Sequence, residues 1–582
     1  MVHIGVCYGH NATVAVVRDG KLIFCQSEER LNRIKNSTGF PKHTLKQVYE
    51  SVCAPSEVAS ATLFESSVFG YLHLKAKQFE PYQYGDYLSP EMKKMGLFRK
   101  LIQTELGWNV SRWRIARKEA DPVLKSEARA YFCKELGIPD SRVFEIKHHL
   151  SHAYSVLPNI SSWPNALVFT LDGQGDWISA TVSSYQNGEL VQLSEDDHRN
   201  SLGYYYSAVT ALMGMKPGEH EFKVMGLAPY AKLEYYSGLL RRLESLLTID
   251  DTGAWRSAIN PSQFMGVLEK CVRGQRFDNI AGAIQELTER LIQKWVDFWM
   301  RKTGIKNIAL AGGVFMNVKA CQKLAADPNV ERIFIVPSAA DESTAIGCAV
   351  WGAKTFNPEV PLQPLNDLYL GVAFSDQQAE AALRTMGAHD RYKITRPENI
   401  NKEVAHLLMQ NQVVARCSGP MEFGARALGN RSILANPSQF ENLELINSAI
   451  KSRDFWMPFT PSILEEDMPR YIVGHEKIFA PYMCVTFDTT HEARADLKAA
   501  IHPRDWTARP QCVVRDWNPD YYELITEFKR LTGIGAVLNT SFNLHGEPNV
   551  CSPADALHTI DNSGLKYLAL GGFLLEKKLS KK

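Results

Sequence analysis

The sequence lacks a charge imbalance, and this absence limits what the protein can bind through its overall electrostatics. Its 582 residues include 65 Lys and Arg against 64 Asp and Glu, a formal net charge of +1. Proteins that bind nucleic acid or an anionic membrane through their global charge carry a basic excess. The composition therefore predicts no nucleic-acid partner and no membrane partner, although a local basic patch stays compatible with it.

Long apolar runs and paired cysteines are also missing. No apolar run approaches the roughly 20 residues that a membrane-spanning helix needs, and residues 1–5 enter an expected strand without the apolar core of a signal peptide. The 11 cysteines are scattered, odd in number and contain no Cys-x-x-Cys pair. We interpret them as reduced thiols. We therefore expect a cytoplasmic, globular protein, long enough for two or more domains.

Two histidines stand one helical turn apart in the segment KHHLSH, residues 147–152. His148 and His152 are at positions i and i+4, which places both imidazoles on one helix face. Two imidazoles so spaced can bind one metal ion together with a carboxylate from elsewhere. The alternative is a pair of ordinary polar helix residues. A metal site is favoured by the apolar run 166–171, an expected strand that delivers Asp172 into a glycine-rich turn.

One pattern of expected strands occurs twice. Residues 3–7, 12–18 and 21–25 form the first set, with the hairpin signal Asp19-Gly20 before its last strand. The second set is made of residues 166–171, 178–184 and 189–193, with Asn187-Gly188 in the same place. Such duplicated units with helical connections are typical of the actin, hexokinase and heat-shock ATPase folds. Two unrelated hairpins in an α/β protein are the alternative.

Two further strand ends carry residues suited to a ligand. The expected strand 307–310 leads into Gly312, Gly313 and Asn317, and a strand–Gly-Gly–helix sequence lets the backbone approach a ligand closely. A tight turn explains these glycines equally well. Asp341 follows the expected strand 332–336 and precedes a helix, where carboxylates often face a ligand, although an N-cap is the commoner use of this position.

A helix and a linker organise the middle of the chain. Residues 278–303 form the clearest expected helix, and its apolar positions should face the core. They are Ile280, Ile284, Leu287, Leu291, Trp295 and Phe298. The proline-containing segment 357–364 reads as a linker. We therefore place a domain boundary near residue 365, which divides the chain into domains 1–365 and 366–582.

The second domain contains several cations that lie beside glycine- or proline-marked turns. Any single one of them is best explained as solvated surface charge. Brought together by the fold, they would suit a phosphate-bearing ligand, helped by nearby Ser and Asn side chains. The set comprises Arg426, Arg431, Lys451, Arg453, Arg509, Asn539 and Ser541.

Seven motifs occur in a fixed order along nearly the whole chain. They are HHLSHA (148–153), LDGQGD (171–176), FKVMGLAPY (222–230), LAGGVFMN (310–317), SAADESTAIG (338–347), MEFGARALGNRSIL (421–434) and LNTSFN (538–543). With these motifs the chain resembles the O-carbamoyltransferase family, which includes NodU and the tobramycin-type carbamoyltransferases.

The resemblance implies an α/β fold with two parts and a two-step reaction. Residues 1–365 would form an actin-like, TsaD-like domain built on duplicated ribonuclease-H-type units, and residues 366–582 a YrdC-like α/β domain. The second domain would join carbamoyl phosphate and ATP into carbamoyl-adenylate. The first would pass the carbamoyl group to a hydroxyl of a small-molecule acceptor, such as a natural product or a sugar. The implied cofactors are a divalent metal, typically iron(II), and Mg²⁺ with ATP.

The resemblance also implies roles for individual residues. His148, His152 and Asp341 match the metal ligands, and Asp172 is either a further ligand or a direct neighbour. His10 lies near the transferred group and is our candidate base, and Lys35 lies near the nucleotide phosphates. The residues expected to bind cofactor or substrate are Gly312, Gly313, Asn317, Arg426, Lys451, Arg453, Arg509, Asn539 and Ser541.

One departure and several alternatives stay open. Many relatives have Arg where this chain has Met457, so Arg453 or another cation would have to replace it. The rival functions are an actin-fold kinase or ATPase, a TsaD-like tRNA threonylcarbamoyl-type transferase, and a regulatory binder without catalysis. The acceptor is not determined, although the aromatic and basic region 71–115 is expected to help select it. The oligomeric state is open, with a homodimer as one alternative.

Overall fold

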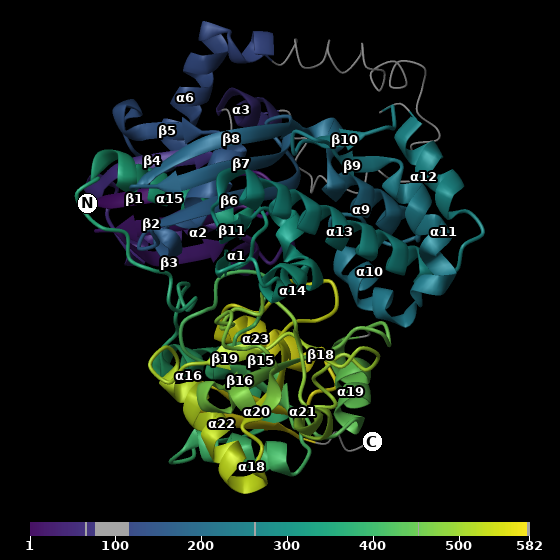
Figure 1. Ribbon diagram of the computed structural model, residues 1–582. Coiled ribbons are helices and arrows are strands. Elements are labelled where there is room, and N and C mark those ends of the chain that lie inside the picture. Colours follow the sequence, from purple (N-terminus) through teal and green to yellow (C-terminus); the bar gives the residue numbers. More distant parts are fainter. Residues whose placement is uncertain (65–66, 76–115, 261–262, 452, 579–582) are drawn as a thin grey trace. The chain divides into compact units, whose positions relative to one another are not determined.

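The computed structural model describes residues 1–64, 67–75, 116–260, 263–451 and 453–578 (Figure 1). The chain divides into two compact units. Unit 1 comprises Met1–Phe24 and Ser37–Pro364, and unit 2 comprises Cys25–Asn36 and Leu365–Lys582. Both contain helices and sheets, so the α/β class predicted from the sequence is confirmed. Most of the region 71–115, which was expected to contact the acceptor, lies outside the described residues.

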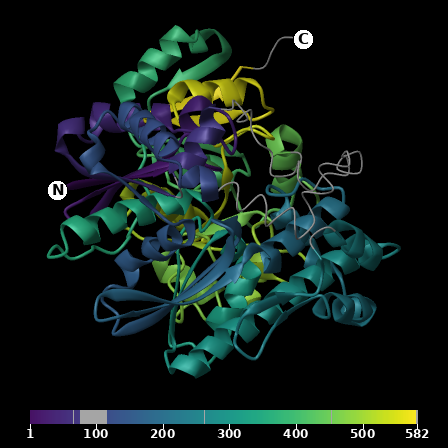
Figure 2. The same cartoon turned by 90° about the horizontal axis from the view of Figure 1, so that it is seen from above.

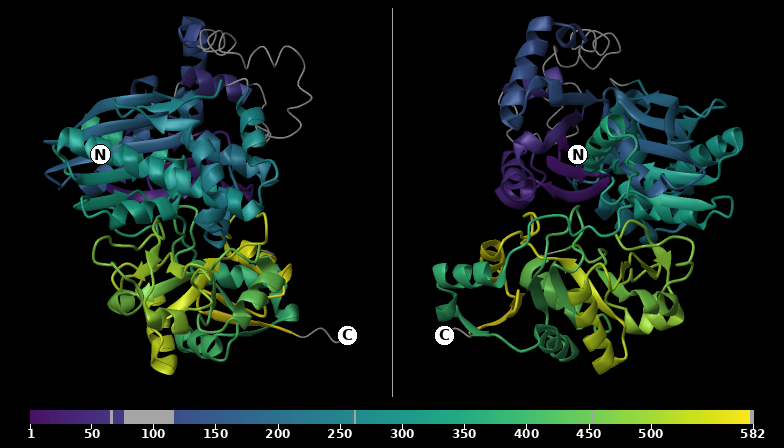
Figure 3. Two further views of the ribbon diagram at one scale, coloured as in Figure 1. Left: turned by 45° about the vertical axis from the view of Figure 1, so that its right-hand side comes forward. Right: turned by 90° about the vertical axis from the view of Figure 1, so that its left-hand side faces the viewer.

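Unit 1 contains two five-stranded sheets with the same strand order. Figure 3 shows the ribbon from two further sides. In each sheet the first strand in sequence runs antiparallel to the second and parallel to the fourth, and the fourth is parallel to the fifth. The first sheet has the order β3-β2-β1-β4-β5, and the second has the order β8-β7-β6-β11-β12. All six strands of the pattern seen twice in the sequence are therefore present. The bounds are β1 Val2–Cys7, β2 Thr13–Arg18, β3 Lys21–Ser27, β4 Val58–Phe64, β5 Val143–Ile146, β6 Asn165–Gly175, β7 Ile178–Gln186, β8 Glu189–Asp197, β11 Asn307–Ala311 and β12 Arg332–Ile335.

Helices α7 and α15 connect the two sheets of unit 1. Helix α15 contacts β1, β2 and β4 of the first sheet, whereas α7 contacts β6 and β7 of the second, and the two helices contact each other. Both units contain helices. Those of unit 1 are α2 Lys42–Ser51, α3 Ser67–Lys75, α6 Pro122–Leu136, α7 His148–Ser155, α8 Leu157–Ile160, α9 Leu202–Leu212, α10 Glu221–Leu227, α11 Leu233–Glu244, α12 Phe264–Val272, α13 Phe277–Thr303, α14 Val318–Ala326 and α15 Glu342–Phe356, with the hairpin β9 Leu247–Ile249 and β10 Trp255–Ser257.

Two glycines allow α15 to lie this close to its neighbours. A Cβ on Gly347 would stand 1.7 Å from the carbonyl oxygen of Ser151 in α7. A Cβ on Gly5 of β1 would stand 1.9 Å from the carbonyl oxygen of Ala345 in α15. Interiors are packed without spare volume, so any side chain at either position would push the helix away. These contacts therefore set the spacing between α7, α15 and the first sheet.

The long helix α13 buries the stripe that its sequence predicts, with one change at its end. Helix α13 packs against β6 (Figure 2). The first five predicted core positions are buried, but Trp299 rather than Phe298 completes the buried face near the C-terminus. The predicted positions that are buried are Ile280, Ile284, Leu287, Leu291 and Trp295.

Unit 2 is built around an eight-stranded mixed sheet with the order β13-β22-β21-β14-β15-β20-β16-β19. A buried apolar core forms around it, with contributions from Ile433, Leu538, Leu557 and Leu568. Its strands are β13 Tyr392–Thr395, β14 Val414–Cys417, β15 Arg431–Ala435, β16 Thr460–Leu464, β19 Gln511–Val513, β20 Ala536–Ser541, β21 Tyr567–Leu570 and β22 Phe573–Lys577, with a separate pair β17 Phe487–Asp488 and β18 Thr507–Ala508. Its helices are α1 Glu29–Asn32, α16 Asp376–Thr385, α17 Ala388–Arg391, α18 Ile400–Met409, α19 Glu441–Ile446, α20 Met468–Tyr471, α21 His491–Asp496, α22 Pro519–Thr532 and α23 Pro553–Asp561.

A short N-terminal segment, residues 25–36, forms part of unit 2 although it lies early in the chain. Arg30 donates a hydrogen bond of 2.7 Å to the carbonyl oxygen of Gly424. Arg33 donates to the carbonyl oxygens of Asn549, at 2.6 Å, and of Pro548, at 3.0 Å. These bonds attach the segment to loops of unit 2. Lys35 lies in this segment and therefore also belongs to unit 2.

In the part of the chain that the structure describes, no helix combines the length and apolar character needed to cross a bilayer.

The close contact between α7 and α15 leads to a stability prediction. Gly347→Ala should lower the free energy of unfolding by about 3 kcal/mol or more, because the new methyl group overlaps the Ser151 carbonyl. Gly238→Ala is the matched control, since a Cβ there meets nothing within 4 Å on helix α11. That change should raise the free energy of unfolding by about 0.5–1 kcal/mol. Urea titration followed by circular dichroism measures both, and equal stability of the two variants would contradict the packing argument.

A buried carboxylate on the edge strand β8 leads to a pH prediction. Asp196 accepts the backbone N–H of Trp255 at 2.9 Å through Oδ1, while Oδ2 has no partner, and burial raises the pKa of this group to about 6. Between its unfolded pKa, near 4, and this value, the folded state binds more protons, so stability falls as pH rises. Asp196→Asn should thus be more stable than the original protein at pH 7, by up to about 3 kcal/mol, and equal to it near pH 3.5.

Asp250 gives a control of opposite sign for the same titration. Partial burial favours its neutral form, but hydrogen bonds from Thr252 and Ala254 lower its pKa to about 2. Asp250→Asn should therefore destabilise the protein at pH 7, and this difference should shrink as pH falls toward 2. Thermal unfolding at a series of pH values measures both variants. The same pH slope for both substitutions would contradict these assignments.

Candidate metal centre and anion site

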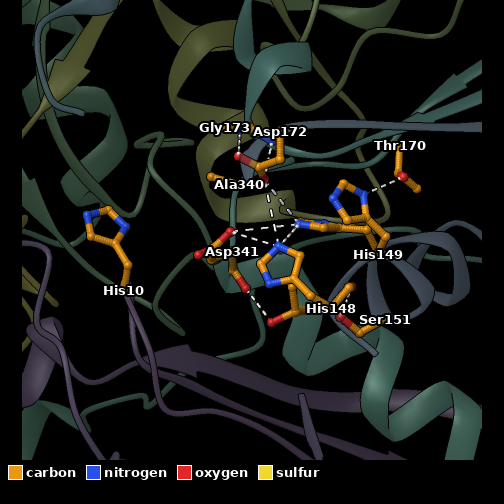
Figure 4. Close-up of polar contacts among 12 residues, drawn as sticks. His10, His148, His149, Ser151, Thr170, Asp172, Gly173, Ala340 and Asp341 are labelled. Carbon is orange, nitrogen blue, oxygen red and sulfur yellow. Dashed lines mark hydrogen bonds and ion pairs between the residues drawn. The ribbon is translucent and has the colours of Figure 1, made fainter. Parts of the chain in front are cut away.

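Four side chains from three elements of unit 1 converge on one point (Figure 4). His148 and His152 lie on α7, Asp172 lies near the end of β6, and Asp341 stands immediately before α15. Each offers one ligand atom, and these atoms all lie within 4.8 Å of one another. The convergence follows from the packing of α7 between β6 and α15.

The distances suit a shared cation. The Nε2 atoms of His148 and His152 are 3.2 Å apart. His152 Nε2 lies 3.3 Å from Asp172 Oδ2 and 3.7 Å from Asp341 Oδ1, and His148 Nε2 lies 4.0 Å and 3.6 Å from the same two atoms. Ligands at about 2.1 Å from a divalent transition metal stand roughly 3 to 3.5 Å from one another. Two imidazoles and two carboxylates are donors that zinc, iron(II) or cobalt accepts.

The carboxylate of Asp172 is held by two backbone N–H groups. Gly173 donates to its Oδ1 at 2.6 Å, and Gly313 donates to its Oδ2 at 3.0 Å. Gly312, before Gly313, has a φ of 100°, and a Cβ there would stand 2.4 Å from the carbonyl oxygen of Leu171. The Gly-Gly turn predicted to approach a ligand thus approaches Asp172. The Gly-Gly turn therefore holds the Asp172 carboxylate in place.

Asp341 occupies the N-cap position of α15, but it does not act as a cap. Its side chain makes no capping hydrogen bond, and its Oδ1 faces the two histidines instead. Ser343, in the first turn of the same helix, lies 3.4 Å from Nδ1 of His152 and donates its own hydroxyl to the carbonyl of Ala340. The Ser343 oxygen is therefore free to accept from Nδ1–H, which leaves the Nε2 lone pair of His152 directed at the cluster.

His149, between the two cluster histidines in sequence, has a structural function. Its Nε2 lies 2.9 Å from the carbonyl oxygen of Ile178, and its Nδ1 lies 2.7 Å from the hydroxyl of Thr170. A carbonyl can only accept, so Nε2 carries the proton and Nδ1 accepts from Thr170. Burial, together with the two neighbouring histidines, lowers the pKa of His149 to about 3. This ring therefore stays neutral and joins α7 to β6 and β7.

The four residues of the cluster shift one another's pKa values: that of Asp172 is lowered and that of His152 is raised. Burial by itself would raise the pKa of Asp172, but the nearby imidazoles of His148 and His152 hold it well below the usual value. Burial would lower the pKa of His152, yet the nearby carboxylates of Asp172 and Asp341 raise it. The carboxylates thus supply the negative charge that a bound cation would neutralise.

A second set of polar residues in unit 2 gathers positive charge. Lys451 is 4% exposed and donates to Asn543 Oδ1 at 2.7 Å and to Ser541 Oγ at 3.1 Å. Burial and the nearby charges of Arg453 and Lys35 hold the pKa of Lys451 well below its usual range. Lys35, expected near nucleotide phosphates, therefore contributes to the field of this set.

Two arginines of this set experience the same repulsion. Burial and the charge of Arg426 lower the pKa of Arg453 to about 10. Burial and the charges of Arg426 and Arg453 hold the pKa of Arg509 well below its usual range. Arg509 Nε is buried without a hydrogen-bond partner, whereas Arg453 donates to Thr540 Oγ1 at 2.9 Å. Lys451 is buried and Arg453 and Arg509 are half-buried, and cations that repel one another in such surroundings suit a polyanionic ligand. We call the five residues the cation cluster: Lys35, Arg426, Lys451, Arg453 and Arg509.

Comparison with protein families identifies what this chain is related to. The family description "Carbamoyltransferase N-terminus" matches residues 2–350, and "Carbamoyltransferase C-terminus" matches residues 405–577. The chain belongs to the carbamoyltransferase family. It is therefore an enzyme of the transferase class, as its sequence motifs predicted.

Individual relatives extend over most of this carbamoyltransferase. The nodulation protein NolNO of Sinorhizobium fredii is 31% identical over 579 residues, which covers 98% of this chain and 79% of that protein. The protein MJ1051 of Methanocaldococcus jannaschii is 30% identical over 587 residues, which covers 99% of both chains. Among solved structures, full-length HypF bound to phosphate and nucleotide is 11% identical, with a TM-score of 0.37 over 62% of this chain and 56% of that one. That value is too low to define the fold.

Two residues predicted for this carbamoyltransferase lie outside the metal cluster. His10 follows β1 in a half-buried loop and is not one of the four converging residues (Figure 4). The next residue, Asn11, donates to Glu342 Oε2 at 3.1 Å, which ties this loop to the start of α15 beside Asp341. Asn317 pairs with Gln285 and accepts from the N–H of Ala320 to cap α14. A cofactor contact by Asn317 and a catalytic role for His10 remain predictions.

In unit 2 the residues expected to contact phosphate have two different functions. Arg431 is 1% exposed and donates only to backbone carbonyls, including those of Cys551 and Ser418, so it supports the loops. Asn539 donates to the carbonyl of Ala427 at 3.1 Å and to Ser462 Oγ at 3.0 Å, while its Oδ1 is buried without a partner. Its predicted ligand contact could use only that oxygen.

Glu422 is a residue that the sequence did not single out. Its Oε1 accepts the backbone N–H groups of Leu428, Asn430 and Arg431 at 2.9, 3.0 and 2.9 Å. A buried carboxylate thus shapes the loop that carries Arg426. An acidic residue inside a glycine-rich, cationic motif was the available signal.

The metal cluster yields a binding prediction. The apo protein should bind one equivalent of Co²⁺ or Zn²⁺, and His148→Ala or Asp341→Ala should weaken this binding by about 100-fold or more, because each removes one ligand. His43→Ala is the matched control, since this exposed histidine lies on α2, away from the cluster. Isothermal titration calorimetry measures the dissociation constants. Unchanged affinity in both cluster variants would rule out this site.

Proposed function

We propose that the protein is an ATP-dependent O-carbamoyltransferase that uses carbamoyl phosphate and a small-molecule alcohol. Beyond the family itself, one observation carries this proposal. A single chain contains a site of two histidines and two carboxylates in unit 1 and a cluster of cations around the buried Lys451 in unit 2. The first is suited to a cation and the second to polyanions. A reaction that first builds and then consumes an activated carbamate needs both kinds of site.

The proposal includes a fold assignment for each part. Residues 1–365 would form an actin-like, TsaD-like domain of duplicated ribonuclease-H-type units, and residues 366–582 a YrdC-like domain. The equal strand order of the two five-stranded sheets supports the duplication. The eight-stranded mixed sheet of unit 2 is compatible with the second assignment.

In the first step, unit 2 would form carbamoyl-adenylate. Hydrolysis of carbamoyl phosphate releases inorganic phosphate and leaves carbamate, whose oxygen attacks the α-phosphorus of Mg²⁺-bound ATP and displaces pyrophosphate. Lys451, Arg453 and Arg509 would neutralise the two polyanions and hold them in line. A polyanion would also offset the burial and the mutual repulsion that lower their pKa values. Asn539 and Ser541 would orient the carbamoyl group.

In the second step, unit 1 would transfer the carbamoyl group. The acceptor hydroxyl attacks the carbamoyl carbon, and AMP leaves with the bonding electrons. His148, His152, Asp172 and Asp341 would hold a divalent ion, iron(II) in our proposal, which when bound supplies positive charge beside the leaving phosphate. His10 would accept the hydroxyl proton, because an imidazole is a suitable base near neutral pH. The loop of His10 is tied to the start of α15 through Asn11 and Glu342.

The remaining parts of the proposal concern the partners. The acceptor would be a natural product or a sugar, and the protein would act in the cytoplasm without nucleic acid or membrane, as a monomer or homodimer. A kinase or plain ATPase would release ADP rather than AMP, and the cation cluster of unit 2 would then have no function in the reaction. A tRNA-modifying function would need a basic surface, which a net charge of +1 does not favour.

The two steps can be separated by substitution of Lys451. Lys451→Ala should lower carbamoyl-adenylate formation by about 100-fold or more, because the buried cation no longer neutralises the phosphates. The same variant should still carbamoylate an acceptor from preformed carbamoyl-adenylate. Release of AMP against a panel of alcohols, followed by mass spectrometry, measures both activities.

The control replaces Lys402, an exposed lysine on α18 of unit 2, by Ala. Lys402→Ala should keep both steps. Full adenylate formation by Lys451→Ala would show that the first step is placed wrongly. Release of ADP by the unaltered protein would instead favour phosphoryl transfer.

A further inference from the structure

The hairpin between β6 and β7 reaches the beginning of helix α7. Its two central residues, Asp176 and Trp177, have φ values of 51° and 69°. Residues other than glycine adopt this left-handed conformation infrequently, and Asp and Asn do so most readily. The turn therefore presents the Asp176 side chain in one direction, toward α7.

Asp176 supplies the cap that α7 does not provide for itself. The residue before the helix, Lys147, makes no side-chain capping bond. Asp176 Oδ2 instead accepts the backbone N–H of His148, the first residue of the helix, at 2.8 Å. A residue that lies 28 positions further along the chain thus satisfies one of the open N–H groups at this helix end.

The same hairpin also fixes the ring of His148. A Cβ on Gly175 would stand 2.1 Å from Cγ of His148, so the ring rests directly on the backbone of the hairpin. On another side, the ring of Phe64 lies at a centroid distance of 5.5 Å. Asp176 holds the main chain of His148 while Gly175 and Phe64 confine its ring. The direction of His148 Nε2 into the cluster depends on all three.

The charge of Asp176 has a second consequence. The first turn of a helix carries a partial positive charge, equivalent to about +0.5 of an elementary charge. His148 and His152 are the first and fifth residues of α7, so a cation bound to them lies close to this positive end. A carboxylate on the first N–H neutralises that end. It therefore lowers the electrostatic cost of placing a cation there.

We propose that Asp176 is a positioning residue of the metal centre, which raises the affinity for a divalent cation without being one of its ligands. The inference rests on the proposed metal site in unit 1. Two effects contribute: the hydrogen bond that orients His148 and the negative charge that offsets the helix end. Partners that orient a metal-binding histidine commonly change affinity by 10- to 100-fold.

Two substitutions separate these effects. Asp176→Asn keeps an acceptor for the His148 N–H and tolerates the left-handed backbone, but removes the charge. Asp176→Gly removes the carboxylate altogether and suits a positive φ, so it adds no backbone strain. We expect Asp176→Gly to weaken Co²⁺ and Zn²⁺ binding by about 10- to 100-fold, and Asp176→Asn by a smaller factor of about 3 to 10.

Asp121 provides a matched control in the same unit. It is the N-cap of α6, and its Oδ1 accepts the N–H groups of Val123 at 2.9 Å and Leu124 at 3.4 Å. Asp121→Asn and Asp121→Gly remove the same groups from a helix that carries no metal ligand. They should leave the metal affinity unchanged, even where they lower thermal stability as much as the Asp176 variants do.

The measurement is calorimetric titration of the full-length apo proteins with Co²⁺ and with Zn²⁺, beside circular dichroism to compare folding. Wild-type affinity in Asp176→Gly, or equal losses in the Asp121 and Asp176 variants, would overturn the inference while the metal site stands. If Asp176→Gly does not fold, the comparison of Asp176→Asn with Asp121→Asn decides in the same way. An unaltered protein that binds neither ion would overturn the proposed metal site and this inference together.

Discussion

The contact between α7 and α15 is the constraint on which the metal cluster depends. Gly347 lets the backbones of the two helices approach until a Cβ would overlap the Ser151 carbonyl. That approach brings Asp341, at the start of one helix, beside His148 and His152, on the other. The same helices join the two sheets of unit 1. The position of four polar side chains is therefore decided by how closely two backbones pack.

The two units collect charge of opposite kinds, and the overall composition conceals it. Unit 1 concentrates carboxylates and imidazoles at one point, and unit 2 gathers cations around the buried Lys451. The formal net charge of the whole chain, +1, reveals neither local cluster. In the reaction we propose, this separation would be useful, because a polyanionic donor and a cation-dependent transfer need unlike surroundings. The function is thus a matter of local fields rather than of total charge.

Both sites also depend on residues that touch no ligand in our proposal. The N–H groups of Gly173 and Gly313 donate to the Asp172 carboxylate and hold it in place. In unit 2 the Glu422 carboxylate accepts backbone N–H groups and so holds the loop that carries Arg426. Such backbone bonds keep a charged side chain in place at little cost in entropy, because the donors are already ordered. Arginines that both lie beside turn residues in the sequence therefore differ in their hydrogen bonds. Arg431 donates to backbone carbonyl oxygens, whereas the buried Nε of Arg509 has no hydrogen-bond partner.

Sequence alone determined the local elements and the family. The doubled strand pattern, the buried stripe of α13 and the spacing of His148 and His152 follow from periodicity, which depends on neighbours only a few residues away. The resemblance named Asp341 and Asp172, but that both carboxylates stand beside these histidines, that Lys35 belongs to unit 2 and that Asp176 caps α7 were decided by tertiary structure. These contacts join segments distant in the chain, and they exist only once helices and sheets have packed, which no local pattern encodes.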